Sequence, residues 1–294
     1  MKNRWIAIVT IFLIAGAWGS SFTLIKNVLA HIAPEPFIFW RFLLAGAILF
    51  VIAIARRSLT RAALQPGLLL GALVFLGYWA QTRGLLFITP SRSALLTGLY
   101  VVMVPFCDRL LHHTRVTKRA WSAAVLATIG TTVLIGGFDA RPTFGDMLTL
   151  FSAVCFALHV VYSSRYTARH SAIALAAIQV LAVGLLAGPP SLLVPRTAYT
   201  PSVVWVIVAT AVVTTALAFF ALMWSQAHVT ATEAAVILAF EPVAASITSI
   251  GLGEESITRA FLLGGGLILV AMIVSQLPSS ASMRSDAADP RHER

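Results

Sequence analysis

Ten apolar stretches, each about long enough to cross a lipid bilayer as a helix, follow one another along almost the whole chain. Short polar connections separate them, and none of these is long enough to fold as a soluble domain. The sequence therefore predicts an all-α membrane protein of ten transmembrane helices, at 5–30, 35–55, 66–88, 92–112, 119–138, 144–165, 171–194, 202–225, 230–252 and 258–277. The segment 278–294 is rich in Ser, Ala and charged residues, and we expect it to be a disordered cytoplasmic tail.

The amino-acid composition supports a membrane protein. Hydrophobic residues make up 59% of the 294 residues and charged residues only 11%, whereas an ordinary soluble domain carries roughly 25% charge. This balance excludes a soluble globular protein, because too little polar surface remains to hydrate one. The 2 cysteines both fall in apolar stretches, so no disulfide framework is expected.

The net charge of +10 comes from Lys and Arg residues that are concentrated on one side of the predicted membrane. Fourteen lie at the termini or in connections on that side, whereas the other side holds four: Arg92, Arg141, Arg196 and Arg259. Because cytoplasmic loops carry the excess of Lys and Arg, we expect a multi-pass protein of the cell (inner) membrane with both termini cytoplasmic. The cations are thus explained by topology, and no nucleic-acid partner is expected.

The second half of the chain repeats the arrangement of the first. Shifting the sequence against itself by a fixed number of residues, called the larger offset below, aligns Thr89–Leu96 with Thr230–Ile237. A slightly smaller shift, called the smaller offset, aligns Ala17–Trp18 with Cys155–Phe156. Identity is low, so hydropathy and the spacing of the connections carry most of this comparison. Each repeat, 5–138 and 144–277, holds five spans, and an odd number forces the two repeats into opposite orientations. We expect two inverted five-helix repeats, with a binding site near the bilayer midplane where they meet.

Several short motifs occur in order along the chain: Ala17–Phe22 with Lys26, Arg41–Gly46, Ser93–Pro105, Gly145–Leu148, Glu241–Pro242 and Gly253–Glu254. Together they resemble the EamA family of the drug/metabolite transporter superfamily, over about 5–277. His112–Thr114 departs from the Gly-Glu pair that the family commonly shows at that point. The resemblance implies a ten-helix permease, usually an exporter of small organic metabolites. Substrates vary widely across this family, so the resemblance names none.

Glu241 is the most informative polar residue, because it lies near the middle of the ninth predicted span, where a charged group is costly. Pro242 cannot donate a hydrogen bond to the carbonyl of Leu238 and so predicts a helix break. Such a carboxyl can titrate, bind a cation or hold a substrate amine; the alternative is a structural carboxyl hydrogen-bonded to another helix. Pro105 predicts a similar break at Val101, at a neighbouring depth in the other repeat.

Two further spans carry a cation inside the predicted membrane. Trp18, Phe22 and Lys26 share one helical face of the first span, and a cation beside two aromatic rings is typical of a cavity for an organic anion or zwitterion. Alternatively, the rings pack or face lipid and the Lys26 amine reaches the outer interface. Arg41 lies about six residues inside the second span, too deep to reach the interface easily, and we expect it to be paired.

Four more polar residues complete the candidate substrate pathway: Tyr78 and Gln81 on the third span, Tyr100 on the fourth and His159 on the sixth. We expect Trp18, Tyr78, Tyr100 and His159 to border one central cavity. For His159 the alternatives are a proton relay and a hydrogen-bonded contact between helices.

Motifs of known catalytic chemistry are absent: the sequence has no HExxH, GxSxG or Walker motif. No enzyme activity, metal or cofactor is therefore expected. The expected function is secondary active transport of a small organic metabolite, amino-acid-like or drug-like, out of the cell by alternating access, with protons as the simplest coupling ion. Its partners are then the substrate and the lipid bilayer. Alternatives are an importer of the same fold and a membrane-embedded lipid-modifying enzyme, which would need carboxylates or His clustered at one membrane face.

Overall fold

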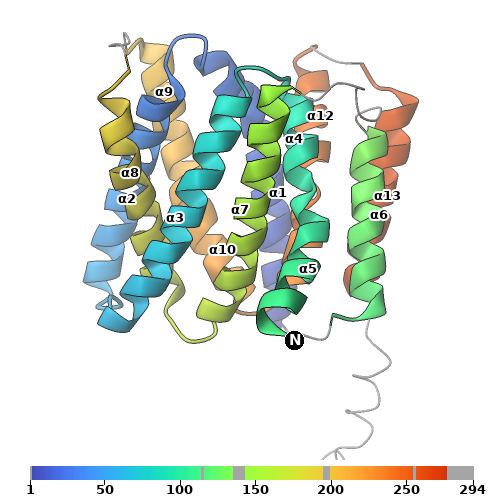
Figure 1. The fold of residues 1–294 in the computed structure, drawn as a ribbon, viewed down its shortest axis with the longest axis horizontal. Coiled ribbons are helices and arrows are strands. Elements are labelled where there is room, and N and C mark those ends of the chain that lie inside the picture. Colours follow the sequence, from blue (N-terminus) through green and yellow to red (C-terminus); the bar gives the residue numbers. More distant parts are fainter. Residues whose placement is uncertain (1, 114–115, 135–142, 195–198, 254–255, 277–294) are drawn as a thin grey trace, which may run out of the picture.

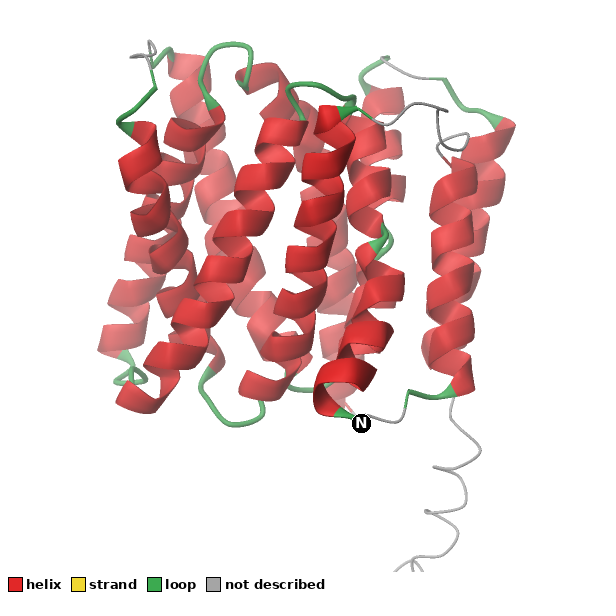
Figure 2. Ribbon diagram, in the orientation of Figure 1, coloured by secondary structure: helices red, strands yellow, loops and turns green. Residues whose placement is uncertain are grey.

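Helices stand side by side and are joined by short loops at both ends of the bundle in the computed structural model (Figure 1). The structure describes residues 2–113, 116–134, 143–194, 199–253 and 256–276. The predicted tail at 278–294 lies outside the described residues, as do Arg141, Arg196 and Glu254. Within the described ranges, every regular element is a helix (Figure 2).

Helical segments lie at each of the ten predicted stretches. The first half consists of α1 (Lys2–Val28), α2 (Pro34–Ala55), α3 (Arg61–Gly84), α4 (Pro90–Gly98), α5 (Tyr100–His112) and α6 (Lys118–Leu134). The second half consists of α7 (Phe144–Tyr166), α8 (Ala172–Ser191), α9 (Pro201–Ala209), the π-helix η1 (Thr210–Leu217), α10 (Ala218–Gln226), α11 (Ala231–Leu238), α12 (Glu241–Gly251) and α13 (Arg259–Gln276).

Eight helical stretches of the described chain are long and apolar enough to cross a membrane. The two others are α6, which has 17 residues, and α13, whose apolar part is Leu262–Ser275. The prediction of an all-helical chain with membrane-length helices is therefore confirmed at this level.

Threonine side chains mark where several helices begin. Thr89, Thr143 and Thr230 each accept a hydrogen bond from the backbone N–H three residues later. Such caps satisfy N–H groups that the first turn of a helix leaves unpaired. At Thr143 and Thr230 the third helical residue, Asp146 or Glu233, accepts a bond from the cap backbone in return, which completes a capping box. The caps fix the start of α4, α7 and α11 and orient two carboxylates at the bundle ends.

The fourth and ninth predicted spans are each broken near their middle. Leu99 separates α4 from α5, while Ala239 and Phe240 separate α11 from α12. The larger offset of the internal repeat places Leu99 on Phe240, so the breaks occupy equivalent positions in the two halves.

The break in the ninth span lies where Pro242 predicts it, and Pro242 occupies the first turn of α12, where its missing N–H costs little. The helix break that Pro105 predicts at Val101 lies at Leu99 instead, so its predicted position is wrong. Pro105 lies inside α5, because a helix can continue past the loss of one hydrogen bond. The chain instead tightens after Gly98, a poor helix former, where the Leu99 N–H bonds the Leu96 carbonyl at 3.4 Å.

The eighth predicted span contains the π-helix η1 between α9 and α10. Its wider turns place more residues between hydrogen-bonded groups than an α-helix does. The Thr210 carbonyl oxygen accepts hydrogen bonds from the hydroxyls of Thr214 at 3.1 Å and Thr215 at 2.9 Å. This local widening presents two neighbouring threonines toward α1 and α2.

The two halves meet closely where α2 packs against α8. A Cβ atom added at Gly46 would lie 2.6 Å from Leu181 Cα, and one added at Gly184 would lie 2.7 Å from the Leu43 backbone nitrogen. The smaller offset of the repeat places Gly46 on Gly184 and Leu43 on Leu181. The helices therefore meet through equivalent surfaces, and each needs its glycine for the backbones to approach.

Candidate functional site

A cavity lies between the two halves and reaches the breaks of the fourth and ninth spans. Its volume is about 40 Å³, which in this structure is room for a few water molecules. Six of the residues singled out from the sequence line it: Trp18, Tyr78, Gln81, Tyr100, His159 and Glu241. The structure thus brings residues from both halves of the chain to one enclosed space.

A second cavity, about 20 Å³ in volume, adjoins the first and shares Trp18, Tyr78, Gln81 and Glu241 with it. Phe22 and Arg41 line this second cavity. The two cavities, together called the central cavity below, are lined by residues of both halves.

Glu241 is the acidic group of the central cavity. It is the first residue of α12, directly after the helix break, and is 9% exposed. Its carboxylate forms no hydrogen bond or ion pair with another described residue. The sequence left open the alternative that Glu241 is a structural carboxyl hydrogen-bonded to another helix. Among the described residues, Glu241 forms no such bond. Glu241 instead faces a space that a ligand or proton could reach.

Arg41 is the basic group of the central cavity and is only 2% exposed. Its Nε donates to the Thr215 hydroxyl at 2.7 Å, and its Nη2 donates to the Thr214 hydroxyl at 3.0 Å. The expected pairing is thus with hydroxyls of η1, and among the described residues no carboxylate lies within ion-pair distance of Arg41. Among the described residues, no anionic side chain therefore balances the Arg41 guanidinium.

Aromatic rings hold the Arg41 guanidinium in place. Its Cζ lies 5.4 Å from the ring centre of Phe42 and 5.2 Å from that of Tyr78, distances typical of cation–π contacts. The Tyr78 ring in turn meets Phe156 edge-on, with centres 5.3 Å apart. An aromatic wall therefore joins the cation to the cavity.

Trp18 is fixed by the π-helix as well. Its indole Nε1 donates to the Thr214 carbonyl at 2.8 Å, and its ring lies 5.7 Å from that of Phe219. Phe22, one turn further along α1, is 4% exposed and lines the cavity near Arg41. Both rings therefore face the protein interior, which excludes the lipid-facing alternative.

Gln81 and His159 connect helices around the cavity. Gln81 Nε2 donates to the Thr97 hydroxyl at 2.9 Å and so joins α3 to α4. His159 Nε2 lies 2.7 Å from Gln179 Oε1 and 3.3 Å from the Ser163 hydroxyl, which joins α7 to α8. His159 is thus a hydrogen-bonded interhelical residue and a cavity-lining residue at once.

Lys26 is not itself among the residues that line the central cavity, although it contacts Leu85, which lines it. Its amine donates to the backbone carbonyls of Leu85 and Ile88, just beyond the end of α3. Carbonyl groups at a helix C-terminus attract cations, because they lack partners and carry the negative end of the helix dipole. That Lys26 acts on a substrate together with Trp18 and Phe22 stays a prediction; its amine reaches this cavity only through its contact with Leu85.

Sequence reasoning missed the threonines that hold Arg41 and Trp18. Thr214 and Thr215 are consecutive hydroxyl residues in the middle of a mostly apolar span, and that pair was the available signal. Phe219, whose ring contacts Trp18, Tyr78 and His159 at 5.7–6.2 Å, was missed too. Within the described residues, no cluster of three or more His, Cys, Asp or Glu side chains is placed to hold a metal ion.

Comparison with known proteins adds to this geometry. The EamA-like transporter family matches residues 5–136 and 143–276. An uncharacterized transporter of Archaeoglobus fulgidus is 31% identical over 278 residues, which cover 94% of this chain and 87% of that protein. The uncharacterized transporter YoaV of Bacillus subtilis is 23% identical over 94% of this chain and 97% of its own length. A crystal structure of a protein 20% identical in sequence has the same fold, with a TM-score of 0.78 over 97% of this chain and 100% of that one.

Proposed function

This chain belongs to the EamA-like transporter family, and from that membership we propose that it is a secondary active exporter of a small organic metabolite. Transport is by alternating access, in which the central cavity opens first to one side of the membrane and then to the other. The observation that carries this proposal is the central cavity itself, lined by both halves and holding a carboxylate with no partner among the described residues.

The substrate is a small organic molecule that carries both an anionic and a cationic or proton-donating group. Support comes from Arg41 and Glu241, which line one cavity without an ion-pair partner among the described residues. A buried cation and a buried carboxylate each favour a ligand group of opposite charge. The aromatic wall of Trp18, Tyr78 and Phe156 suits an apolar body between those groups. Amino-acid-like and drug-like metabolites both meet this description.

Glu241 couples transport to protons. A carboxyl that serves this purpose must exchange a proton or substrate with its surroundings, and a strong fixed partner would prevent that exchange. The Glu241 carboxylate has no such partner among the described residues and borders the cavity.

In the membrane, the chain forms ten crossings as two inverted repeats, with both termini in the cytoplasm. Three observations support this topology: a helical segment at each of the ten stretches, the equivalent glycine contacts of α2 and α8, and the equivalent breaks at Leu99 and Phe240. The concentration of Lys and Arg on one side supports the orientation in an inner membrane.

A metabolite screen tests the proposal. Cells that overproduce the protein, cells that lack it and cells that produce the Glu241→Gln variant at equal level are compared for the composition of their growth medium. We expect at least one small organic metabolite to accumulate outside only the cells with the wild-type protein. Media that match in all three cultures across a range of loaded metabolites would contradict export.

A further inference from the structure

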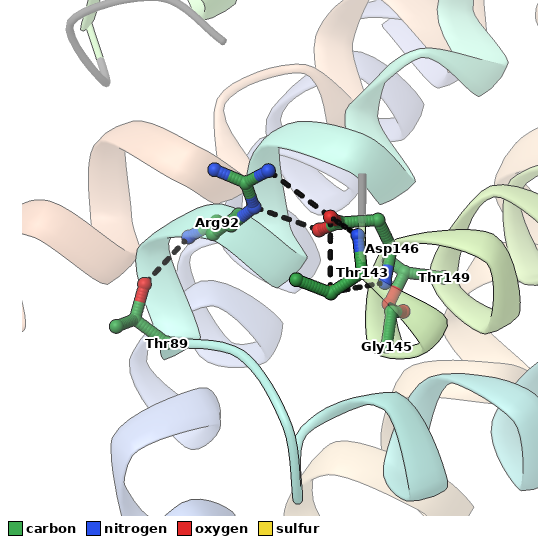
Figure 3. Close-up of polar contacts among 6 residues, drawn as sticks. All are labelled: Thr89, Arg92, Thr143, Gly145, Asp146 and Thr149. Carbon is green, nitrogen blue, oxygen red and sulfur yellow. Dashed lines mark hydrogen bonds and ion pairs between the residues drawn. The ribbon is translucent and has the colours of Figure 1, made fainter. Parts of the chain in front are cut away.

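Among the ion pairs that join the halves of the molecule, two lie at opposite ends of the bundle and at the starts of helices. In the first, Arg92 Nε donates to Asp146 Oδ1 at 2.7 Å and Arg92 Nη2 donates to Oδ2 at 3.0 Å (Figure 3). In the second, Arg4 Nη2 donates to Glu233 Oε1 at 2.8 Å, at the end where the chain begins. Each pair links a helix of the first half to a helix of the second.

The two pairs occupy similar positions at the starts of helices in the two halves. Arg92 and Glu233 are the third residues of α4 and α11, and the larger offset of the repeat places one on the other. Arg4 and Asp146 are also the third residues of α1 and α7, although the smaller offset of the repeat places Arg4 about one helical turn before Asp146. The same contact thus occurs twice, at opposite ends and with the two charges exchanged between the halves.

The helices that these pairs join are also the helices that line the central cavity. From α1 and α7 come Trp18 and Phe156, and from α4 and α11 come Thr97 and Leu238. A contact that holds α4 to α7 closes one end of the cavity wall, and a contact that holds α1 to α11 closes the other. The cavity lies along these helices between the two pairs.

In each pair the carboxylate is held in place independently of the arginine. Asp146 Oδ2 accepts the Thr143 backbone N–H at 2.6 Å, and Glu233 Oε2 accepts the Thr230 backbone N–H at 3.0 Å. The capping box therefore orients the carboxylate whether or not the arginine is bound. Each carboxylate is a preformed receptor that an arginine on the opposite half can leave and rejoin.

Partial exposure makes both contacts reversible. The side chains of Arg92 and Asp146 are 18% and 4% exposed, and those of Arg4 and Glu233 are 37% and 16% exposed. When a pair separates, the arginine regains water and the carboxylate keeps the hydrogen bond of its capping box, so breaking the pair costs less than breaking a fully buried one. A contact of this strength can bias a conformational equilibrium without locking it.

We propose that Arg92–Asp146 and Arg4–Glu233 are two latches that open in alternation and expose the central cavity to opposite sides of the membrane. This inference rests on the proposed alternating access. Both ion pairs are formed in this structure, so it corresponds to the state in which the halves are joined at both ends of the bundle. When one latch opens while the other stays closed, the central cavity opens to one side of the membrane, and the reverse arrangement opens it to the other side.

Two other ion pairs define the controls. Arg165 Nη2 lies 3.3 Å from Asp108 Oδ1 and also links the halves, at the same end as Arg4. Arg83 Nε lies 2.6 Å from Glu35 Oε1 at the same end as Arg92, but joins α3 to α2 within one half. Opening the end near Arg4 therefore requires neutralising Arg4 and Arg165 together, whereas neutralising Arg83 leaves both latches intact.

Labelling of a cysteine in the cavity measures which end is open. In a Cys107→Ser, Cys155→Ala background, Val74→Cys supplies a reporter that lines the cavity. A membrane-impermeant maleimide is applied to right-side-out and to inside-out vesicles that hold the full chain. The substitutions are Arg92→Gln, the double change Arg4→Gln with Arg165→Gln, and Arg83→Gln as the matched control; each leaves the carboxylates and the capping boxes in place.

We expect Arg92→Gln to raise the labelling rate from one side about fivefold or more, and the double variant to raise it from the opposite side by a similar factor. Arg83→Gln should match the background protein on both sides. Equal changes on both sides, changes in the same direction, or no change in either latch variant would overturn the proposal. Loss of transport in every protein together with opposite labelling shifts would instead contradict the proposed function and leave the latches standing.

Discussion

Arg41 and Glu241 are a basic and an acidic group that share a cavity, yet each lacks an ion-pair partner among the described residues. Burial of a charge is costly unless hydrogen bonds or an opposite charge offset it. Arg41 is offset by two hydroxyls and by aromatic rings, and Glu241 only by its exposure to the cavity. A ligand that brings the missing charges therefore gains more binding free energy here than at a site already paired.

The planar guanidinium group of Arg41 predicts that a lysine cannot replace it. Arg41→Lys keeps the charge but gives up the two parallel hydrogen bonds to Thr214 and Thr215, because an ammonium cannot match that geometry. We expect the apparent substrate affinity to fall about tenfold, the size of one or two charged hydrogen bonds, and Arg41→Gln to lose more. Concentration dependence of export measures both.

Arg83→Lys is the matched control for Arg41, since Arg83 is half-exposed and lies outside the cavity. Its affinity should stay at the wild-type value. If Arg41→Lys and Arg83→Lys behave alike, the charge at Arg41 does not contact substrate.

Single residues of the cavity were partly predictable from the sequence. Trp18, Tyr78 and Glu241 stand out because polar and amphipathic groups are few in apolar spans and are costly unless they face a cavity or a partner. The contacts of Lys26 could not be predicted, because helix periodicity gives its face but not the end of α3 to which its amine donates. Thr214 was missed, because a threonine can satisfy its hydroxyl on its own helix and so carries little signal.

At the scale of the helices, Gly19 sets the position of Glu241. A Cβ atom at Gly19 would lie 2.2 Å from the Glu241 carbonyl oxygen and 2.8 Å from Ala244 Cβ. The close approach of α1 and α12 therefore depends on the missing side chain, and α12 begins with the carboxylate of the cavity.

Gly19→Ala should force α1 and α12 apart. We expect a loss of stability of about 1–3 kcal/mol, the usual cost of overpacking, together with reduced export, because Glu241 moves with the backbone that is displaced. Thermal unfolding in detergent and an export assay measure the two effects. Gly16→Ala is the control on the same helix, since a Cβ atom there meets nothing within 4 Å; equal melting temperatures for the two variants would refute this packing role.

The existence of the helices could be predicted from hydropathy, but their interruptions only in part. Pro242 reveals one break because a proline lacks the donor that helix continuity requires. The break at Leu99 carries no such marker, and the proline nearest to it in α5, Pro105, is accommodated within that helix. The π-helix η1 has no composition that distinguishes it from an α-helix, because it arises from how Thr210 and its neighbours pack.

At the scale of the whole molecule, contacts between the two halves agree with the internal repeat, although the sequence did not predict these contacts. Gly46 and Gly184 exchange places in the α2–α8 contact, and Arg92 and Glu233 exchange places in the two ion pairs. Such agreement is expected if the halves are related by a two-fold axis in the membrane plane. Low sequence identity hides these details until the contacts are seen.

Membrane topology gives a prediction at this scale. Reporter fusions after Ser58 and after His170 should be cytoplasmic, and a fusion after Arg141 should be periplasmic, because Lys and Arg are concentrated on the cytoplasmic side. Paired reporters that are active on opposite sides of the membrane check each site. A periplasmic signal after Ser58 would reverse the orientation.

The central claim is that the cavity of Glu241 couples the movement of an organic solute to protons. The most direct measurement is accumulation of an exported metabolite in proteoliposomes, with and without an imposed proton gradient, for the wild-type protein and Glu241→Gln. The Gln side chain keeps the shape of Glu241 but cannot exchange a proton. We predict that the gradient drives accumulation by the wild-type protein across a range of pH, whereas the variant folds and inserts normally but shows no response to the gradient. Equal gradient-driven accumulation by both proteins would contradict the account.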